Sequence, residues 1–458
     1  MQTKEGKLKI SIMDPKDVFS RIYQDYKYKF LFESKDVSQI YGRLSLIGVD
    51  PVLKITGKNK SFGIEVLNKR GHKYIKQLNQ TSQENGNIST IIKHVLETFK
   101  TNEKTLLGLY GTFSYDFVRL FENIDDSLPE NDVNDFTLFL YDTFIFFDHL
   151  KGNTEIIIYR ENGKELKEGM VEISNKIKNQ SETPEYKIKN PYFSFSEKQY
   201  EGLVKTAKRY TKKGDLFEVV FSNILKAEFE GDPFGLYLRY RKENPSPYLF
   251  FFDLGHEQLV GASPEMMVRY ENGIVNLRPI SGTIKRGENP IEDHENMLKL
   301  LMDPKEKAEL DMLIDLGRND LSRVCKPGIR ITDYRFVEKY SKVMHTVANL
   351  SGELQEGCTA LDALIACLNA GTLTGAPKVA AMKIIEKHEK ERRGYYGGTI
   401  GYLTFSGEMD TGIIIRTAHI KNGQLRFQVG ATLLNYSKPK KEYQETINKA
   451  QAFLNTFI

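Results

Sequence analysis

The stretch Gln258–Thr283, QLVGASPEMMVRYENGIVNLRPISGT, decides the fold class of this chain. It contains several strand-like apolar runs that are separated by short turns, with no helical segment between them. Two more strand-like runs, FEVVFSNILKAEF and YLFFFDLG, precede it at 217–229 and 248–255. Strands and helices therefore do not alternate around a glycine-rich nucleotide loop, which argues against a doubly wound parallel sheet.

The N-terminal part of the chain has a mixed pattern. Residues 8–180 contain short β-like runs, such as LSLIGVDPVLKIT at 44–56, and amphipathic helix candidates, such as ISTIIKHVLETF at 88–99, so this part looks α+β. The segment SETPEYKIKNPYFS at 181–194 is polar, holds two prolines and has no period, which is typical of a linker. We therefore divide the chain into an N-terminal region, 1–180, and a C-terminal region, 193–458.

Composition and charge exclude several classes of function. The 458 residues carry 65 Lys and Arg and 61 Asp and Glu, a formal charge of +4 with both signs mixed, which does not indicate nucleic-acid binding. The three cysteines form no C-x-x-C pair, which predicts reduced thiols in a cytoplasmic protein. The longest apolar run, FTLFLYDTFIFF at 136–147, is too short to span a bilayer and reads as a core strand, and no secretory start is visible.

The stretch DPKEKAELDMLIDLGRND at 303–320 predicts a helix with acidic residues near its start. Asp303 as N-cap and Glu306 three positions later form a capping-box pattern around a first-turn proline. Glu309 differs, because it shares a face with the apolar residues four and seven positions later. A carboxylate beside apolar neighbours needs a partner or a cation.

The last helix, at 439–457, repeats this arrangement. Glu442, Glu445 and Lys449 share one of its faces. If the two helices face one another, their four carboxylates repel unless a hard cation lies between them, and an oxygen-only ligand set with open water positions suits Mg²⁺. The alternative is two solvated faces whose glutamates pair with nearby lysines.

Four other places are candidate sites with ordinary structural alternatives. His345 lies in an apolar strand-like run, where a satisfied core histidine is the common outcome. Arg416 follows three isoleucines and needs an anion, either a structural carboxylate or a ligand. Glu265 follows a Gly-Ala-Ser turn, where a surface glutamate is the default. The turn AGTLTGAPKVAAMKII at 370–385 leads into a helix N-terminus that can hold a carboxylate, although most such turns only begin helices.

In this order, the motifs resemble the chorismate-utilising enzymes, and among them the large subunit of anthranilate synthases, component I. The N-terminal matches are LFESKD from Leu31 and YGRLSLIGVDP from Tyr41. The C-terminal matches are GDLFEVVFS, NPSPYLFFF, GASPE, RPISGTIKRG, DPKEKAELDMLIDLGRNDLSRV, KVMHTVANLSG, AGTLTGAPKVAAMKII, RRGYYGGTIGYLT, MDTGIIIRTA and KPKKEYQETINKA. The resemblance spans nearly the whole chain and implies an α+β fold with two large antiparallel sheets packed face to face and helices outside.

The resemblance also implies a substrate and a metal. It makes Glu309 and Glu445 the ligands of Mg²⁺, with Glu306 and Glu442 completing the acidic cluster, and the ion bridges to the ring carboxylate of chorismate. The substrate-binding positions that match are Gly282, Thr283, Tyr396, Arg416, Gly430 and Lys449.

The implied chemistry is the first step of tryptophan biosynthesis. Glu265 matches the general acid that protonates the departing C4 hydroxyl, Thr372 matches a position lining the ring, and His345 matches the histidine associated with the elimination of pyruvate. Ammonia attacks C2 to give aminodeoxyisochorismate, and a separate glutamine amidotransferase subunit is the implied ammonia source, which predicts a hetero-oligomer. The implied tryptophan feedback site comprises Leu31, Glu33, Ser34, Asn244, Pro245, Ser246, Pro247 and Tyr248.

Two positions bear on which family member the chain resembles. Isochorismate and salicylate synthases carry a water-activating lysine where this chain has Glu218, and aminodeoxychorismate synthases carry a lysine nucleophile where it has Ser281. Anthranilate synthases usually have glutamine and alanine there, and Thr432 and Asn435 also depart from the usual glycine and acidic residue. The alternatives are aminodeoxychorismate synthase component I of the folate pathway, an isochorismate synthase, and a non-catalytic subunit that binds a small dicarboxylate.

Overall fold

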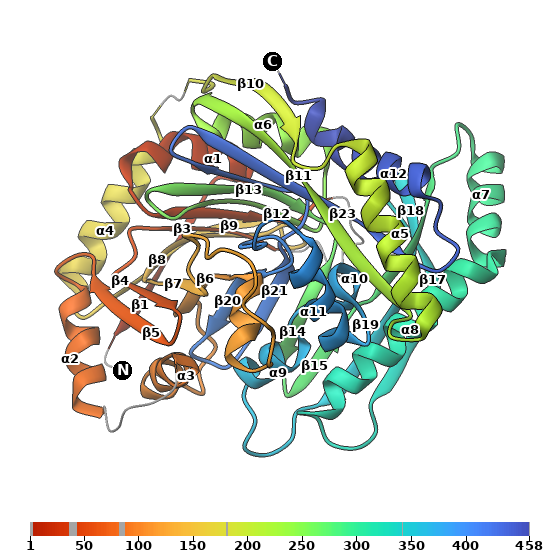
Figure 1. Ribbon diagram of the computed structural model, residues 1–458. Helices are drawn as coiled ribbons and strands as arrows, with labels where there is room; N and C mark the ends of the chain where they lie inside the picture. Colours follow the sequence, from red (N-terminus) through yellow and green to blue (C-terminus); the bar gives the residue numbers. More distant parts are fainter. Residues whose placement is uncertain (1–2, 36–43, 82–87, 180–181, 341, 458) are drawn as a thin grey trace.

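The computed structural model describes residues 3–35, 44–81, 88–179, 182–340 and 342–457, which form two antiparallel sheets flanked by helices (Figure 1). The first sheet has 12 strands. Their order is β1 (Lys4–Ile10), β9 (Asn153–Arg160), β8 (Thr143–Asp148), β3 (Leu44–Val49), β2 (Lys29–Glu33), β12 (Tyr248–Asp253), β13 (Glu257–Ser263), β22 (Thr417–Lys421), β23 (Gln424–Leu433), β11 (Glu218–Gly231) and β10 (Tyr186–Phe193), with β19 (Gly375–Ala376) beside β11.

The second sheet has 11 strands. Their order is β16 (Ile280–Lys285), β18 (Val343–Glu353), β15 (Ile274–Leu277), β14 (Met266–Glu271), β21 (Met409–Ile413), β20 (Thr399–Thr404), β6 (Gly108–Phe113), β7 (Phe136–Tyr141), β4 (Leu53–Lys58) and β5 (Ser61–Val66), with β17 (Arg330–Lys339) beside β18. The expected pair of large antiparallel sheets is confirmed.

Both sequence regions contribute to both sheets. β2 pairs with β12 in the first sheet and β6 pairs with β20 in the second, so red and orange strands lie beside green and blue ones in Figure 1. The boundary near residue 190 therefore divides the sequence but not the sheets. The predicted linker is wrong over 186–193, because these residues form β10 and pair with β11 at the sheet edge. Their alternation of lysines and apolar residues suits an edge strand.

The chain passes between the sheets at tight corners, and two runs that we expected to be single strands are each divided there. The run at 44–56 forms β3 and β4, and Asp50 at the corner has a left-handed φ of 52°. The run at 136–147 forms β7 and β8 with Asp142 between them. Both runs are apolar on either side of the corner, and only Asp50–Pro51 and Asp142 interrupt them. Burial differs across the first corner, because β3 is buried at nearly every residue whereas β4 alternates between buried and half-buried residues.

Aromatic side chains fill the space between the sheets. The rings of Phe30 on β2 and Tyr110 on β6 lie 5.1 Å apart, and those of Phe252 on β12 and Phe139 on β7 lie 6.0 Å apart. Each pair joins one sheet to the other, and both distances are typical of favourable aromatic contacts. Phenylalanine and tyrosine thus supply the large core side chains of a chain that has no tryptophan.

Helices cover the outer faces. They are α1 (Pro15–Ile22), the 3₁₀ helices η1 (Tyr23–Asp25) and η2 (Tyr115–Leu120), α2 (Gly71–Thr81), α3 (Ile88–Thr98), α4 (Gly163–Lys176), α5 (Glu197–Lys213), α6 (Pro233–Glu243), α7 (Pro290–Met302), α8 (Pro304–Ser322), α9 (Ala360–Cys367), α10 (Gly371–Thr374), α11 (Lys378–His388) and α12 (Pro439–Leu454). Within the described residues, none is both long and apolar enough to cross a membrane.

Candidate active site

The candidate active site is a cavity of about 180 Å³ beside two corners where strands change sheet. β13 leads into β14 through Pro264 and Glu265, and β21 leads into β22 through a turn that contains Arg416. Backbone hydrogen bonds join the corners, because the amide of Ile413 donates to Glu265 O and that of Ala262 donates to Arg416 O. All residues predicted for catalysis and substrate binding line this cavity: Glu265, His345, Thr372, Gly282, Thr283, Tyr396, Arg416, Gly430 and Lys449.

Glu265 is a buried carboxyl group with one side-chain hydrogen bond. Its side chain accepts from Thr372 Oγ1 at 2.9 Å. Burial raises the pKa of Glu265 to about 7, although this hydrogen bond and the charges of Arg416 and Lys449 act to lower it. A carboxyl group with a pKa near neutrality can donate a proton at pH 7.

His345 on β18 is held as a neutral imidazole. Its Nδ1 lies 2.9 Å from Gly282 O and 3.0 Å from Thr283 Oγ1. A carbonyl oxygen only accepts, so Nδ1 carries the proton and Nε2 keeps a free lone pair. Burial lowers the pKa of His345 to about 4. The positive charge of Arg416 lowers this pKa further, whereas the hydrogen bond to Gly282 O acts to raise it. The ring is therefore uncharged at neutral pH, and its Nε2 is available as a base.

Arg416 supplies a half-buried positive charge without a counter-charge. Its guanidinium has no hydrogen-bond or ion-pair partner within the part of the chain that the structure describes. The hydroxyl of Tyr396, which also lines the cavity, lies 2.7 Å from where a Cβ on Gly430 would be. Gly430 thus gives the phenol its space. An unpaired arginine beside a phenol forms a site for a carboxylate.

Lys449 adds a second cationic group from α12. Its Nζ donates to Gly430 O at 2.9 Å and lies 3.9 Å from Glu445 Oε1. Desolvation lowers the pKa of Lys449, while Glu445 and Glu309 act to raise it. The amine therefore lies between the acidic groups of α8 and those of α12.

The start of α8 differs in one respect from the sequence prediction. Asp303 caps the helix as expected, with its Oδ1 accepting from the amides of Lys305 and Glu306. The reciprocal half of the capping box is not formed. The Glu306 carboxylate instead packs against β16. Its Oε2 lies 2.9 Å from the point that a Cβ atom would occupy if Gly282 had a side chain. Gly282 has a left-handed φ of 66°, a backbone conformation that favours glycine.

The acidic side chains of the two helices act on one another. Burial and the charges of Glu306 and, more weakly, Glu442 raise the pKa of Glu309. Glu309 lines the cavity, whereas Glu306, Glu442 and Glu445 lie outside its lining. In the described residues no three acidic, His or Cys side chains lie close enough to form a metal site by themselves. The oxygen-only donor set and its mutual repulsion suit a hard cation that takes its remaining ligands from water or substrate.

Two further cavity residues have unpartnered polar atoms. Glu218 at the start of β11 is 1% exposed, and its Oε2 has no hydrogen-bond partner among the residues that the structure describes. Burial and the nearby charge of Glu309 raise the pKa of Glu218 to about 8. The hydroxyl of Ser281 on β16 is also buried without a partner. Neither position carries an amine, so the lysine-dependent chemistries have no nucleophile or base here.

The sequence analysis missed Gln428. It lies on β23, lines the cavity, and donates from Nε2 to Ser222 Oγ at 2.6 Å. Gly430 and Thr432 follow it at every second position and line the same cavity. Strand alternation from Gly430 was the signal that pointed to it.

A second cavity, of about 700 Å³, lies between the sheets and receives four residues of the expected tryptophan site: Glu33, Ser34, Pro247 and Tyr248. The two motifs that contain them are adjacent, because Lys35 N donates to Ser246 O at 3.0 Å. Leu31 packs on the opposite face of β2, and Asn244, Pro245 and Ser246 lie outside the cavity lining. Asp36 and Tyr41–Arg43 of the N-terminal motifs lie outside the described residues.

Residues 27–455 match the family of chorismate binding enzymes, and this chain belongs to that family. Within it, the chain is 37% identical to anthranilate synthase component 1 of Aquifex aeolicus over 459 residues, which cover 96% of this chain and 91% of the relative. It is 43% identical to anthranilate synthase component 1 of Pseudomonas aeruginosa over 362 residues, which cover 75% and 74%. The crystal structure of anthranilate synthase component I from Streptococcus pneumoniae superposes with a TM-score of 0.74 at 33% identity, covering 89% of this chain and 91% of that one.

Proposed function

We propose that this protein converts chorismate and ammonia to anthranilate and pyruvate through aminodeoxyisochorismate. The observation that carries the proposal is the pairing of an uncompensated cation, Arg416, with a buried acid, Glu265, and a neutral base, His345, in one cavity. Chorismate carries two carboxylates and a hydroxyl leaving group, so it needs all three functions. The name of the relatives, anthranilate synthase component 1, supports the same activity.

The amination step uses Glu265 in its protonated form. Ammonia forms a bond to C2 of the ring, both ring double bonds shift towards C4, and the C4 hydroxyl departs as water with the proton of Glu265. The ammonium group formed at C2 then loses a proton to give the amine. Thr372 holds that carboxyl group through its hydroxyl, and Arg416 with Tyr396 holds the enolpyruvyl carboxylate. The free lone pair of His345 then suits it to accept the C2 proton as the ring becomes aromatic and pyruvate leaves.

Glu309 and Glu445 would hold Mg²⁺, with Glu306 and Glu442 nearby, and Lys449 assists at the ring carboxylate. The raised pKa of Glu309 shows that its surroundings penalise another negative charge. The bound ion supplies the positive charge that lets a dianionic substrate enter this acidic region. Glu309 lines the cavity, so a cation held there would favour binding of the ring carboxylate near α8.

The alternative amination product is aminodeoxychorismate. Ser281 stands where that chemistry uses a lysine, and its buried, unpartnered hydroxyl is a poor covalent nucleophile. Glu218 likewise replaces the lysine that activates water in isochorismate synthases. The cavity therefore favours direct attack by ammonia.

The ammonia comes from a separate glutamine amidotransferase subunit in a cytoplasmic hetero-oligomer. The name "component 1" of the relatives supports a partner, and free Cys325, Cys358 and Cys367 fit a reducing compartment.

The 700 Å³ cavity is the proposed site of feedback by tryptophan, with Glu33 and Tyr248 in its wall. Inhibition of the purified protein by tryptophan, abolished in Ser34→Phe, tests this assignment, and equal inhibition of both proteins contradicts it.

The decisive assay incubates the protein with chorismate, Mg²⁺ and ammonium, and follows anthranilate fluorescence and pyruvate release. Equal amounts of both products support the proposal. An aminated product without pyruvate indicates aminodeoxychorismate, isochorismate indicates the water-dependent reaction, and unchanged chorismate indicates a binding subunit.

Glu309→Gln tests the metal role in the same assay. We expect turnover to be lost while the thermal midpoint is kept, because the substitution removes one carboxylate charge at the ion but keeps the side-chain shape. Asp311→Asn is the matched control, since this exposed carboxylate on the same helix pairs with Lys307 outside the cavity. Full activity in Glu309→Gln, or undiminished activity after chelation of divalent ions, contradicts the role.

A further inference from the structure

Arg393 lies in the loop between α11 and β20, and its side chain is 1% exposed. Its guanidinium donates from Nε and Nη2 to both carboxylate oxygens of Glu389, at 3.0 and 2.7 Å. It also donates from Nη1 to Leu373 O at 2.6 Å and from Nη2 to Val220 O at 2.7 Å. These contacts use four of the five donors of one rigid, planar group.

The contacts of Arg393 reach three separate walls of the active-site cavity. Leu373, whose carbonyl accepts from Nη1, directly follows Thr372 in the chain. Val220 lies on β11 two residues after Glu218. The guanidinium carbon is also 5.5 Å from the ring centre of Tyr396, within the range of a cation–π contact. One side chain outside the cavity lining thus joins its own loop to a segment 20 residues earlier and to β11, 173 residues earlier.

Glu389 extends this arrangement to a fourth wall. Its Oε1 accepts from the amide and the hydroxyl of Ser222, both at 2.8 Å, and Ser222 Oγ accepts from Gln428 Nε2. Gln428 lines the cavity from β23. Because these groups are buried and hydrogen-bonded, a shift of the guanidinium leaves a polar group unpaired, so the network resists displacement.

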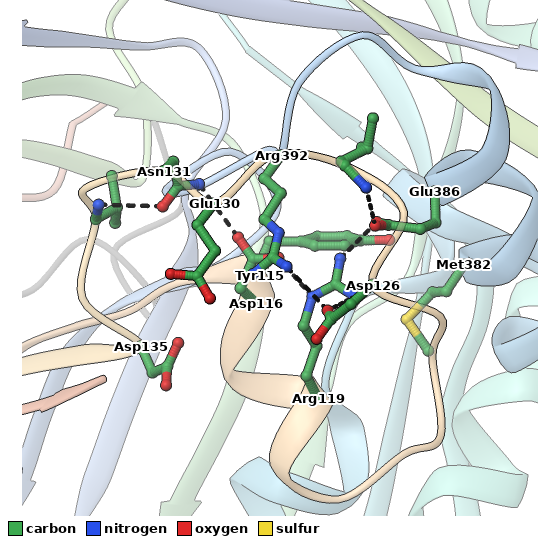
Figure 2. A network of polar contacts seen from close by, with 12 residues as sticks. Tyr115, Asp116, Arg119, Asp126, Glu130, Asn131, Asp135, Met382, Glu386 and Arg392 are labelled. Atoms are coloured by element: carbon green, nitrogen blue, oxygen red, sulfur yellow. Dashed lines mark hydrogen bonds and ion pairs between the residues drawn. The ribbon is translucent and has the colours of Figure 1, made fainter. Parts of the chain in front are cut away.

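The neighbouring Arg392 has a different environment. Figure 2 shows it directed to Asp126, with which it pairs at 2.9 Å. Asp126 and Glu386 are both held by Arg119, and Glu386 accepts from the amide of Ser127. This second network fastens the loop before β7 to α11 and includes no residue of the cavity lining. Arg392 and Arg393 are both buried, at 6% and 4% exposed over the whole residue. Arg392 holds the loop before β7, whereas Arg393 contacts the walls of the cavity.

We propose that Arg393 is a positioning residue for the amination of chorismate: it sets Thr372 and Tyr396 against the substrate and makes no contact with the substrate itself. The inference rests on the proposed function. Thr372 in turn donates to Glu265, so Arg393 is linked to the general acid through two hydrogen bonds and the peptide link between Thr372 and Leu373. A lysine keeps the charge at this position but cannot bind Glu389 and two divergent carbonyl groups together.

The test compares Arg393→Lys with Arg392→Lys as the full chain in the ammonium-dependent assay. We expect Arg393→Lys to lower kcat about 10- to 100-fold, since small misplacements of reacting groups have effects of this size. The KM for ammonium should change less than kcat. Arg392→Lys should keep kcat within about twofold. Equal losses in both variants, or unchanged kcat in Arg393→Lys, would overturn the proposal.

Two further measurements separate positioning from a general loss of stability. If Arg393 acts through Thr372, Arg393→Lys should shift the alkaline limb of the kcat/KM profile to higher pH, as Thr372→Val does, and the double variant should show no further shift. Additive shifts, or an unshifted limb, contradict the inference. If Arg393→Lys does not fold, Ser222→Ala removes one hydroxyl bond to Glu389 and should show a smaller effect of the same kind. Anthranilate formation by the wild-type protein, measured first, shows independently whether the proposed function holds.

Discussion

Two buried carboxyl groups occupy similar places in this fold and have different surroundings. Asp142 lies at the corner where β7 of the second sheet leads into β8 of the first, and Glu265 lies at the corner between β13 and β14. They are 0% and 8% exposed. At both corners the backbone turns sharply between the layers, which brings a polar side chain into the molecule.

Asp142 is fully compensated. Arg70 donates to both of its oxygens, from Nε at 2.9 Å and Nη2 at 3.1 Å. Arg160 Nη1 lies 3.1 Å from Oδ2, and Thr143 Oγ1 donates to Oδ1. Among the described residues, the Glu265 carboxyl group has one hydrogen-bond partner, the hydroxyl of Thr372, and its pKa is raised to about 7. The comparison teaches that the number of close partners, rather than burial alone, separates a structural carboxylate from a reactive one.

The largest expected effect is on catalysis by Glu265→Gln. The substitution keeps the shape of the side chain but removes the proton that departs with the C4 hydroxyl, so kcat should fall by about 10³-fold. The thermal midpoint should be unchanged or higher, because an ionisable group leaves a buried site. Anthranilate formation and calorimetry measure the two quantities. Retained kcat would end the assignment of Glu265 as the acid.

The complementary expectation concerns Asp142→Asn. This change leaves Arg70 and Arg160 without their shared counter-charge, so the free energy of unfolding should fall by about 3 to 5 kcal/mol, as when one partner of a buried ion pair is removed. Activity per folded molecule should be kept, since Asp142 lies outside the active-site cavity. Denaturant titration measures the free energy of unfolding, and kcat per folded molecule measures the activity. A loss of kcat with an unchanged free energy of unfolding would contradict the structural role of Asp142.

The smallest expected effect sharpens the account of Glu265. Its raised pKa implies that kcat/KM falls as pH rises above about 7, because the protonated acid is the active form. Thr372 lowers this pKa, so Thr372→Val should raise it and move the alkaline limb by about one unit to higher pH. A limb that moves to lower pH would contradict the assigned direction of the hydrogen bond.

The raised pKa of Glu265 should make the free energy of unfolding depend on pH. The folded-state pKa of Glu265, about 7, lies above the ordinary glutamate value of 4.5. The folded protein therefore binds more protons than the unfolded chain between these values, and stability falls as pH rises from about 4.5 to 7. The difference between the wild-type protein and Glu265→Gln isolates this contribution in denaturant titrations at several pH values.

Much of the fold and of the site could be predicted from the chain. The helix at Glu197–Lys213 ends at Gly214, which adopts a left-handed φ of 81°, and a glycine at this point is a sequence signal for a helix end. The predicted linker failed because edge strands are polar. The runs at 44–56 and 136–147 were each taken as one strand, although Asp50–Pro51 and Asp142 interrupt them where the chain changes sheet. Gln428 was accessible from strand alternation, whereas the bonds of Arg393 to Leu373 O and Val220 O join segments with no local pattern in common.

The amino-acid sequence by itself determined the family, the antiparallel sheets and the residue types that line the cavity, because motifs, periodicity and side-chain chemistry are local properties. The tertiary structure alone decided which buried acids receive arginine partners and which face a lone hydroxyl. It also decided that Arg392 fastens a loop while Arg393 reaches three walls of the site. The physical reason is that desolvation and charge pairing depend on distances between groups far apart in the chain, and only the packed sheets set those distances.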